Sequence, residues 1–173
     1  MPVFSSSSYR FYEGLVDLKK TDVGDLRCAI SYGPATLEPH HPDLFWYGIH
    51  PTEGLFTIMG PACETVVRTA TADTDVVTGT WSGGRVGSLI GLRKGPTPDK
   101  VIVFGTKQVA EQKGSGDYAP MLREIIKFFQ TGIAPVSPEE TLQIYAFMEA
   151  ADESKRQGGA TVKISDVMKR NAP

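Results

Sequence analysis

Four β-rich segments follow one another closely between residues 64 and 109, at 64–70, 75–81, 85–92 and 101–109. Ser82-Gly83-Gly84 separates the second from the third, and two glycines supply the positive φ angles that a type I′ hairpin turn needs. Strands joined this tightly must pair antiparallel, because a parallel pair needs a crossover of about a dozen residues. The sequence therefore predicts an antiparallel meander.

Apolar spacing predicts helices on either side of this meander, at 9–19, 117–130 and 137–157. The last of these has the sequence of a capping box, with Ser137 as N-cap, Pro138 in the first turn and Glu140 three residues after the cap. Residues 26–32 and 161–164 are expected to be further strands. The expected fold class is α+β, a mostly antiparallel open sheet with helices packed on one face.

Chain length, net charge, apolar runs and cysteine content limit the classes of function that we expect for this protein. The chain has 173 residues, and at about 150 residues per domain we expect residues 1–173 to form one domain. Eighteen Lys and Arg against twenty Asp and Glu give a net charge of −2, so a nucleic-acid partner is not expected. No apolar run approaches the ~20 residues of a membrane span, and the N-terminus lacks the pattern of a secretory signal. The two cysteines, Cys28 and Cys63, suit reduced thiols in the cytoplasm.

One motif resembles a dinucleotide fingerprint. Gly114-Ser115-Gly116-Asp117-Tyr118-Ala119 matches G-x-G-x-x-A before a predicted helix. Asp117 would occupy the anion site at the start of that helix, and the preceding strand belongs to a meander instead of a βαβ unit. Residues 131–138 are also too short and proline-rich to form a second buried parallel strand. We therefore interpret the motif as a loop with Asp117 as N-cap and expect no cofactor-binding residue in the chain.

His50 is the candidate catalytic residue. Pro51 suits the first turn of a helix, which would place His50 at the positive end of a helix dipole and favour a neutral imidazole. A neutral histidine can accept a proton from a hydroxyl as a general base, although the same residue could be a cap or a core histidine.

Other polar and aromatic residues offer weaker alternatives. A metal site could combine His40, His41, His50 and Glu53, but the irregular segment around the first two does not fix their direction, and no metal is expected. The aromatic run 45–47 could form a sugar-stacking pocket or part of the core. Most of the scattered arginines, at positions 10, 68, 85 and 93, should be solvated.

Several segments together resemble the glucose–fructose oxidoreductase/inositol dehydrogenase (Gfo/Idh/MocA) family. They are LFWYGIHPTEGLF at 44–56, DVVTGTW at 75–81 with GRVG at 84–87, FFQTG at 128–132, SPEETL at 137–142 and MEAADES at 148–154. The order and spacing of these segments resemble the C-terminal domain of the family over residues 5–164.

The resemblance implies a function and a partner domain. Members of the family bind NAD or NADP on an N-terminal Rossmann domain, whose glycine fingerprint and Glu-Lys-Pro motif are not found in this chain. The expected function is therefore that of the substrate-binding and oligomerisation domain of an NAD(P)-dependent oxidoreductase acting on a sugar or polyol. The isolated chain is expected to fold but to be inactive and to bind no dinucleotide tightly.

The resemblance also suggests site residues. The family pattern D-x-x-x-H places a histidine at His50, but Trp46 stands where the family has Asp. The candidate substrate-binding residues are Trp46, Tyr47, Arg10 and Glu53. Trp46 also favours an alternative, a non-catalytic binding or assembly module on the same scaffold. We expect a homo-oligomer formed through the open sheet face, which should carry some of the following residues: Val76, Val77, Trp81, Val101 and Val103.

Overall fold

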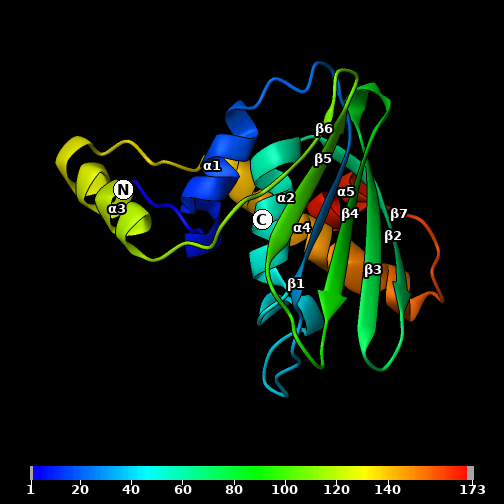
Figure 1. The fold of residues 1–173 in the computed structure, drawn as a ribbon. Helices are drawn as coiled ribbons and strands as arrows, with labels where there is room; N and C mark the ends of the chain where they lie inside the picture. Colours follow the sequence, from blue (N-terminus) through cyan, green and yellow to red (C-terminus); the bar gives the residue numbers. More distant parts are fainter. Residues whose placement is uncertain (1, 171–173) are drawn as a thin grey trace.

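The strands predicted between residues 64 and 109 belong to a seven-stranded sheet in the computed structural model, which describes residues 2–170 (Figure 1). The strands are β1 (Leu26–Pro34), β2 (Cys63–Ala70), β3 (Thr74–Trp81), β4 (Arg85–Leu92), β5 (Lys100–Gly105), β6 (Val109–Glu111) and β7 (Val162–Lys163). Their order across the sheet is β6-β5-β1-β4-β3-β2-β7. All neighbouring pairs are antiparallel except β1 and β4, which are parallel. The predicted meander is therefore wrong at one point, because β1 lies between β4 and β5, and these two strands do not pair. The predicted α+β class with a mostly antiparallel sheet is confirmed.

The hairpin between β3 and β4 forms where the sequence predicts it. Trp81 pairs with Arg85 across a three-residue loop, in which Gly83 and Gly84 have φ angles of 77° and 76°. Both glycines therefore take the left-handed conformation that other residues rarely adopt.

The predicted strand at 101–109 is instead a second hairpin. The chain leaves the strand at Thr106, whose backbone N–H donates to Asp25, while Lys107 donates to the carbonyl of Val23. These bonds to the segment before β1 turn the chain, and β6 returns along β5. The sequence pattern alone does not show this turn, because its hydrogen-bond partners lie about eighty residues away.

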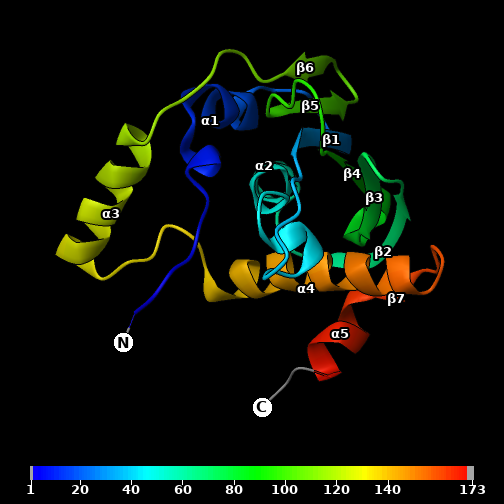
Figure 2. The ribbon, with the colours of Figure 1, turned by 90° about the horizontal axis from the view of Figure 1, so that it is seen from below.

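Two helices cover one face of the sheet, and Figure 2 shows α2 lying in the hollow of the curved sheet with α4 crossing beside it. The helices are α1 (Glu13–Lys20), α2 (Ile49–Met59), α3 (Ala119–Thr131), α4 (Pro138–Arg156) and α5 (Ile164–Arg170), with short 3₁₀ helices η1 (Ser8–Phe11), η2 (Asp43–Phe45) and η3 (Ser82–Gly84). Ser137 caps α4 as predicted, with its Oγ accepting from the N–H of Glu140. The Glu140 side chain, however, pairs with Arg10. Helix α5 was not predicted.

The core between the sheet and the two helices is built around three aromatic side chains. Phe56 of α2, Trp81 of β3 and Phe147 of α4 contact one another with ring centroids 5.5–6.0 Å apart. A Cβ atom on Gly79 or Gly87 would lie 2.7 Å from the Trp81 ring, so both strands must carry glycine beneath the indole.

Helix α3 does not cover the sheet, contrary to the prediction from its apolar stripe. Figure 2 shows it standing apart from the sheet and from α2 and α4. None of its residues is buried, and Phe129 is 82% exposed. Phe128 contacts Phe4 near the N-terminus, with ring centroids 5.1 Å apart. An amphipathic stripe predicts that a helix has an apolar face, but it does not identify what packs against that face.

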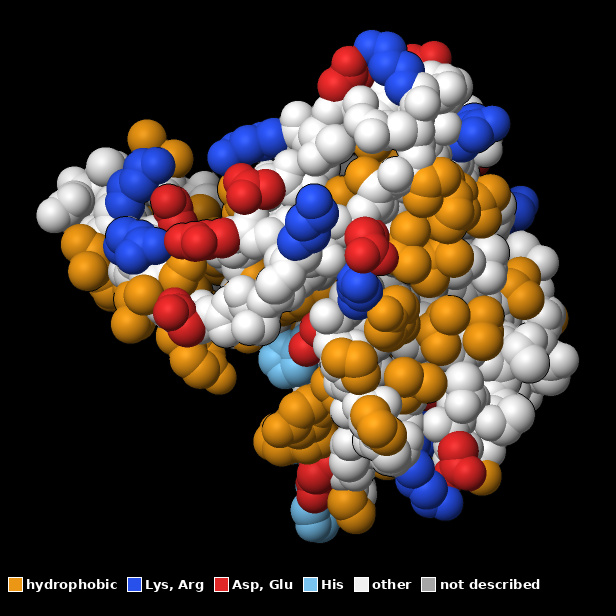
Figure 3. All heavy atoms as spheres, in the orientation of Figure 1, with side chains coloured by type: hydrophobic (Ala, Val, Ile, Leu, Met, Phe, Trp, Pro, Cys, Tyr) orange, Lys and Arg blue, Asp and Glu red, His pale blue; other side chains and the backbone are white. Residues whose placement is uncertain are grey.

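The open face of the sheet is apolar, but four of the five residues predicted there lie elsewhere. Val77, Trp81, Val101 and Val103 are buried on the helix-covered face, and only Val76 lies on the open face, because neighbouring side chains alternate along a strand. The open face carries the alternate residues Ile30, Tyr32, Val67, Val76, Ile90, Ile102 and Phe104. Figure 3 shows hydrophobic side chains gathered over these strands.

Candidate functional site

His50 lies in the first turn of α2, where Pro51 was expected to place it. Its Nδ1 atom lies 2.7 Å from the Oγ of Ser7, and its ring contacts the edge of Tyr47 with centroids 5.6 Å apart. The side chain is only partly buried, and this burial lowers the pKa of His50 below its ordinary value. A lowered pKa favours the neutral form of the imidazole at pH 7.

Ser7 fixes the position of the histidine and was not identified from the sequence as a site residue. Its Oγ accepts from the N–H of Tyr9 and so caps η1. Its backbone N–H donates to Glu53 Oε1 over 3.2 Å. Four consecutive serines give no sequence signal that distinguishes the one beside His50.

Arg10 and Glu53 form a buried ion pair behind the histidine. Arg10 Nε lies 2.7 Å from Glu53 Oε2, and Arg10 Nη2 lies 2.6 Å from Glu140 Oε1. Arg10 is only 8% exposed, so the expectation of a solvated arginine is wrong here. Burial raises the pKa of Glu53, although Arg10 opposes this effect. With two carboxylates on its guanidinium, Arg10 serves to hold η1, α2 and α4 together.

A small pocket of about 140 Å³ opens beside His50. Its lining residues are Ser5, Ser6, Ser7, Ile49, His50, Glu53, Thr141, Ile144 and Tyr145. The lining mixes hydroxyl groups with one imidazole and one carboxylate. The sequence singled out only His50 and Glu53 of this set.

The two aromatic candidates lie beside this pocket instead of lining it. Tyr47 flanks His50, whereas Trp46 contacts His41 with ring centroids 4.7 Å apart. Both side chains are 42% exposed. His41 in turn lies 2.8 Å from Glu38, and no group of three or more His, Cys, Asp or Glu residues within 2–170 could hold a metal ion. The structure thus separates His41 from His50.

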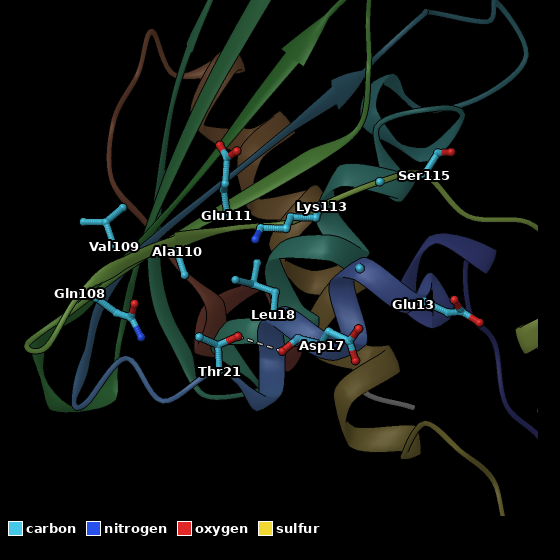
Figure 4. A pocket seen from close by; sticks show the side chains of 12 residues that line it. Glu13, Asp17, Leu18, Thr21, Gln108, Val109, Ala110, Glu111, Lys113 and Ser115 are labelled. Atoms are coloured by element: carbon cyan, nitrogen blue, oxygen red, sulfur yellow. Dashed lines mark hydrogen bonds between the residues drawn. The ribbon is translucent and has the colours of Figure 1, made fainter.

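The glycine motif borders a cavity of about 680 Å³ between α1 and β6 (Figure 4). Gly116 is required there because a Cβ atom would lie 2.2 Å from the ring of Tyr12. Asp117 Oδ1 accepts from the N–H of Ala119, so the protein's own carboxylate occupies the start of α3. The residues of this loop therefore do not fit a dinucleotide phosphate.

A second group of charged residues is buried where the ends of several elements meet. This ion cluster consists of Arg68, Arg93 and Lys155 with Asp43, Asp75 and Asp152. Arg68 is only 1% exposed, so the expectation of solvated arginines is wrong here as well. A sequence pattern cannot predict its burial, because the partners that compensate its charge come from η2, β3 and α4.

Comparisons with known proteins identify the fold. No family model matches the sequence, and no curated protein matches it. A structure from Thermotoga maritima, described as a probable dehydrogenase, matches 92% of this chain and 64% of its own length, with 19% identity and a TM-score of 0.78. An oxidoreductase from Agrobacterium radiobacter, solved with NAD⁺, L-tartaric acid and magnesium, matches 96% of this chain and 66% of its own, with 13% identity and a TM-score of 0.76.

A scyllo-inositol dehydrogenase from Lactobacillus casei matches 91% of this chain and 60% of its own, with 15% identity and a TM-score of 0.68. This chain thus spans less than two thirds of the length of these structures. It has the fold of the matched part of these dehydrogenase and oxidoreductase structures. That fold is consistent with the C-terminal domain of the Gfo/Idh/MocA type, as the resemblance implied. Within residues 2–170, no helix is long and apolar enough to cross a membrane.

Proposed function

We propose that this chain is the substrate-binding and oligomerisation domain of an NAD(P)-dependent oxidoreductase that acts on a sugar or polyol. The observation that carries the proposal is the position of His50, which lines a hydroxyl-rich pocket in a fold shared with dehydrogenases. The neighbouring structures include inositol dehydrogenases, which supports this substrate class.

In this proposal His50 accepts the proton of a substrate hydroxyl. When Nδ1 carries the ring proton and donates to Ser7 Oγ, the lone pair of Nε2 is free to act as the base. Ser7 Oγ can accept this bond because its other lone pair takes the N–H of Tyr9. Glu53 accepts a hydrogen bond from the backbone N–H of Ser7. Glu53 and Ser7 therefore act together to orient the His50 imidazole.

The pocket also limits what can bind. A volume of about 140 Å³ suits one small molecule and is too small for a dinucleotide, since drug-sized ligands occupy roughly 300–1,000 Å³. Hydroxyls from Ser5, Ser6, Thr141 and Tyr145 can both donate to and accept from the hydroxyls of a polyol.

NAD or NADP would be held mainly outside this chain, because the residues of the glycine loop do not fit it. We accordingly expect the isolated chain to be inactive.

We also propose that the chain forms a homo-oligomer through its open sheet face, for which the apolar residues over β1, β3, β4 and β5 provide the support. A symmetric pair would bury this face on both copies.

The two free thiols, Cys28 and Cys63, suit a reducing compartment such as the cytoplasm.

The alternative is a non-catalytic binding or assembly module on the same scaffold. Trp46 stands four residues before His50, where the family has Asp, and its ring contacts Tyr47 and His41. An Asp at this position could accept a hydrogen bond from a substrate hydroxyl and so orient the substrate. Trp46 presents an apolar ring instead.

Titration of the ¹⁵N-labelled chain with myo-inositol and with neutral hexoses tests the proposal. We expect shifts of the amide and ring signals of Ser7, His50 and Thr141, and weaker binding by His50→Gln. Glu149→Gln on the exposed face of α4 is the control and should bind like the wild type. Polyols that shift none of these signals, or shift them equally in His50→Gln, would contradict the proposed substrate class.

A further inference from the structure

The irregular segment 36–48 carries Trp46 and Tyr47 and leads directly into α2. Within residues 2–170, every side-chain hydrogen bond or ion pair that joins residues 36–47 to another element is made by Asp43. The bonds of Glu38, by comparison, go to His40 and His41 in the same segment. Asp43 is therefore the polar attachment of this segment to the rest of the fold.

Asp43 is held by cations from three elements. Its carboxylate lies 2.6 Å from Lys155 Nζ in α4, 3.0 Å from Arg68 Nη2 in β2 and 3.3 Å from Arg93 Nη2, just after β4. Arg68 and Arg93 also bind Asp75, so the sheet holds these two cations in place independently of Asp43. Burial opposes the ionisation of Asp43, but Lys155 and Arg68 outweigh it and hold the pKa of this carboxyl below its usual value.

The contact continues from Asp43 to the histidine. Leu44 is fully buried, and a Cβ atom on Gly48 would lie 2.7 Å from the carbonyl oxygen of Leu44, so η2 packs tightly against the start of α2. Tyr47 lies between Leu44 and His50 in the chain, and its ring contacts the His50 ring edge to face with centroids 5.6 Å apart. A displacement of η2 would therefore move Tyr47 and expose the imidazole to water.

We propose that Asp43 is a positioning residue, which fixes Tyr47 against His50, and Trp46 against Tyr47, through its attachment to Arg68, Arg93 and Lys155. The proposal rests on the proposed function in treating His50 as the functional group of the site. The attachment acts at a distance from the pocket, since Asp43 does not line it.

The test compares two substitutions that each remove one carboxylate from the ion cluster. Asp43→Asn releases segment 36–48, whereas Asp152→Asn removes a partner of Arg68 that belongs to α4. The readouts are the pKa of His50 from its ring signals in ¹⁵N-labelled chain and the acrylamide quenching of tryptophan fluorescence. Quenching reports on Trp46, because Trp81 is buried.

We expect Asp43→Asn to raise the pKa of His50 toward about 6.5, the value of a solvated imidazole, and to increase quenching. Asp152→Asn should leave both readouts near those of the wild type, and Asp43→Glu should restore them in part. Equal changes in the two asparagine variants, or an unchanged His50 pKa in folded Asp43→Asn, would overturn the proposal.

A milder variant serves if Asp43→Asn does not fold. Lys155→Gln removes the most exposed of the three contacts, and we expect it to raise the pKa of His50 by less than Asp43→Asn would. An unchanged His50 pKa and unchanged quenching in Lys155→Gln would overturn the proposal in that case. These readouts need no substrate, so they are independent of whether polyols bind in the pocket.

Discussion

The Nδ1 atom of His50 lies 2.7 Å from the Oγ of Ser7, a residue 43 positions earlier in the chain. This bond joins the first turn of α2 to the segment before α1, so the orientation of the imidazole depends on two elements. The His50 ring has Ser7 on one nitrogen and the edge of Tyr47 against it.

Ser7→Ala should affect the histidine and the local fold together. The variant loses the cap of η1, which costs about 1 kcal/mol of stability, and leaves the imidazole without its Nδ1 partner. We expect weaker polyol binding with the secondary structure retained, measured by calorimetry and circular dichroism. Ser165→Ala in α5 is the control, since Ser165 is exposed and does not line the pocket. Equal binding by both variants would show that Ser7 does not orient the site.

His50 should make the folded chain less stable in mild acid. Its pKa is lowered in the folded state, so the unfolded chain binds more protons than the folded chain once the pH falls below about 6.5. The free energy of unfolding therefore decreases as the pH falls further. Burial raises the pKa values of Asp99 and Asp152 to about 6, and these groups act in the opposite direction. The difference between wild type and His50→Gln therefore isolates the histidine.

Urea unfolding at several pH values measures this difference. We expect the stability of the wild type, relative to His50→Gln, to be constant above pH 7 and to decline progressively below about pH 6.5. A parallel pH dependence in the two proteins would mean that burial does not disfavour the imidazolium form.

Gly87→Ala should destabilise the core. Its Cβ atom would lie 2.7 Å from the indole of Trp81, which Phe56 and Phe147 hold in place, and overpacking of this kind costs about 1–3 kcal/mol. Ser88→Ala, on the open face of the same strand, is the matched control and should change stability much less. The midpoints of urea unfolding compare the two variants.

Charge on the open sheet face should abolish self-association. Val76→Asp places a carboxylate in the apolar patch, and we expect light scattering to show a smaller species than for the wild type. Phe129→Asp adds the same charge on α3, away from the sheet, and should leave the assembly intact. A wild-type chain that is monomeric at tens of micromolar (order of magnitude) would contradict the proposed interface.

Titration with NADH and NADPH should show no tight binding to the isolated chain. We expect no saturable change in nicotinamide fluorescence at micromolar concentrations, since Asp117 occupies the start of α3. Gly116→Val is expected to destabilise the chain through its contact with Tyr12. Micromolar binding that disappears in folded Gly116→Val would instead identify a nucleotide loop.

The sequence predicted those features that depend on local geometry. Gly83 and Gly84 indicated the hairpin through the φ angles that the turn requires, and Pro51 placed His50 in the first turn of α2. These predictions are confirmed because each depends on residues next to one another in the chain. The α+β fold class was also predicted correctly, because it depends on the short connections between neighbouring strands such as β3 and β4.

Features that depend on distant partners could not be predicted in this way. Arg68 is buried because three aspartates from other elements compensate its charge, and no spacing in the sequence relates them. Ser7 reaches His50 only because η1 packs against α2. The exposed position of α3 likewise depends on what the rest of the fold leaves uncovered.

The position of β1 in the sheet determines when its neighbouring strands become available. Strand β1 lies between β4 and β5, yet it precedes both in the chain, so the earliest strand of this sheet is flanked only by later ones. The β2–β3–β4 hairpins can form by local contacts, whereas β1 gains its first neighbour only when β4 is complete at residue 92 and its second when β5 is complete at residue 105. A nascent chain that ends before β4 would expose both edges of β1, and association with other chains would then compete with folding.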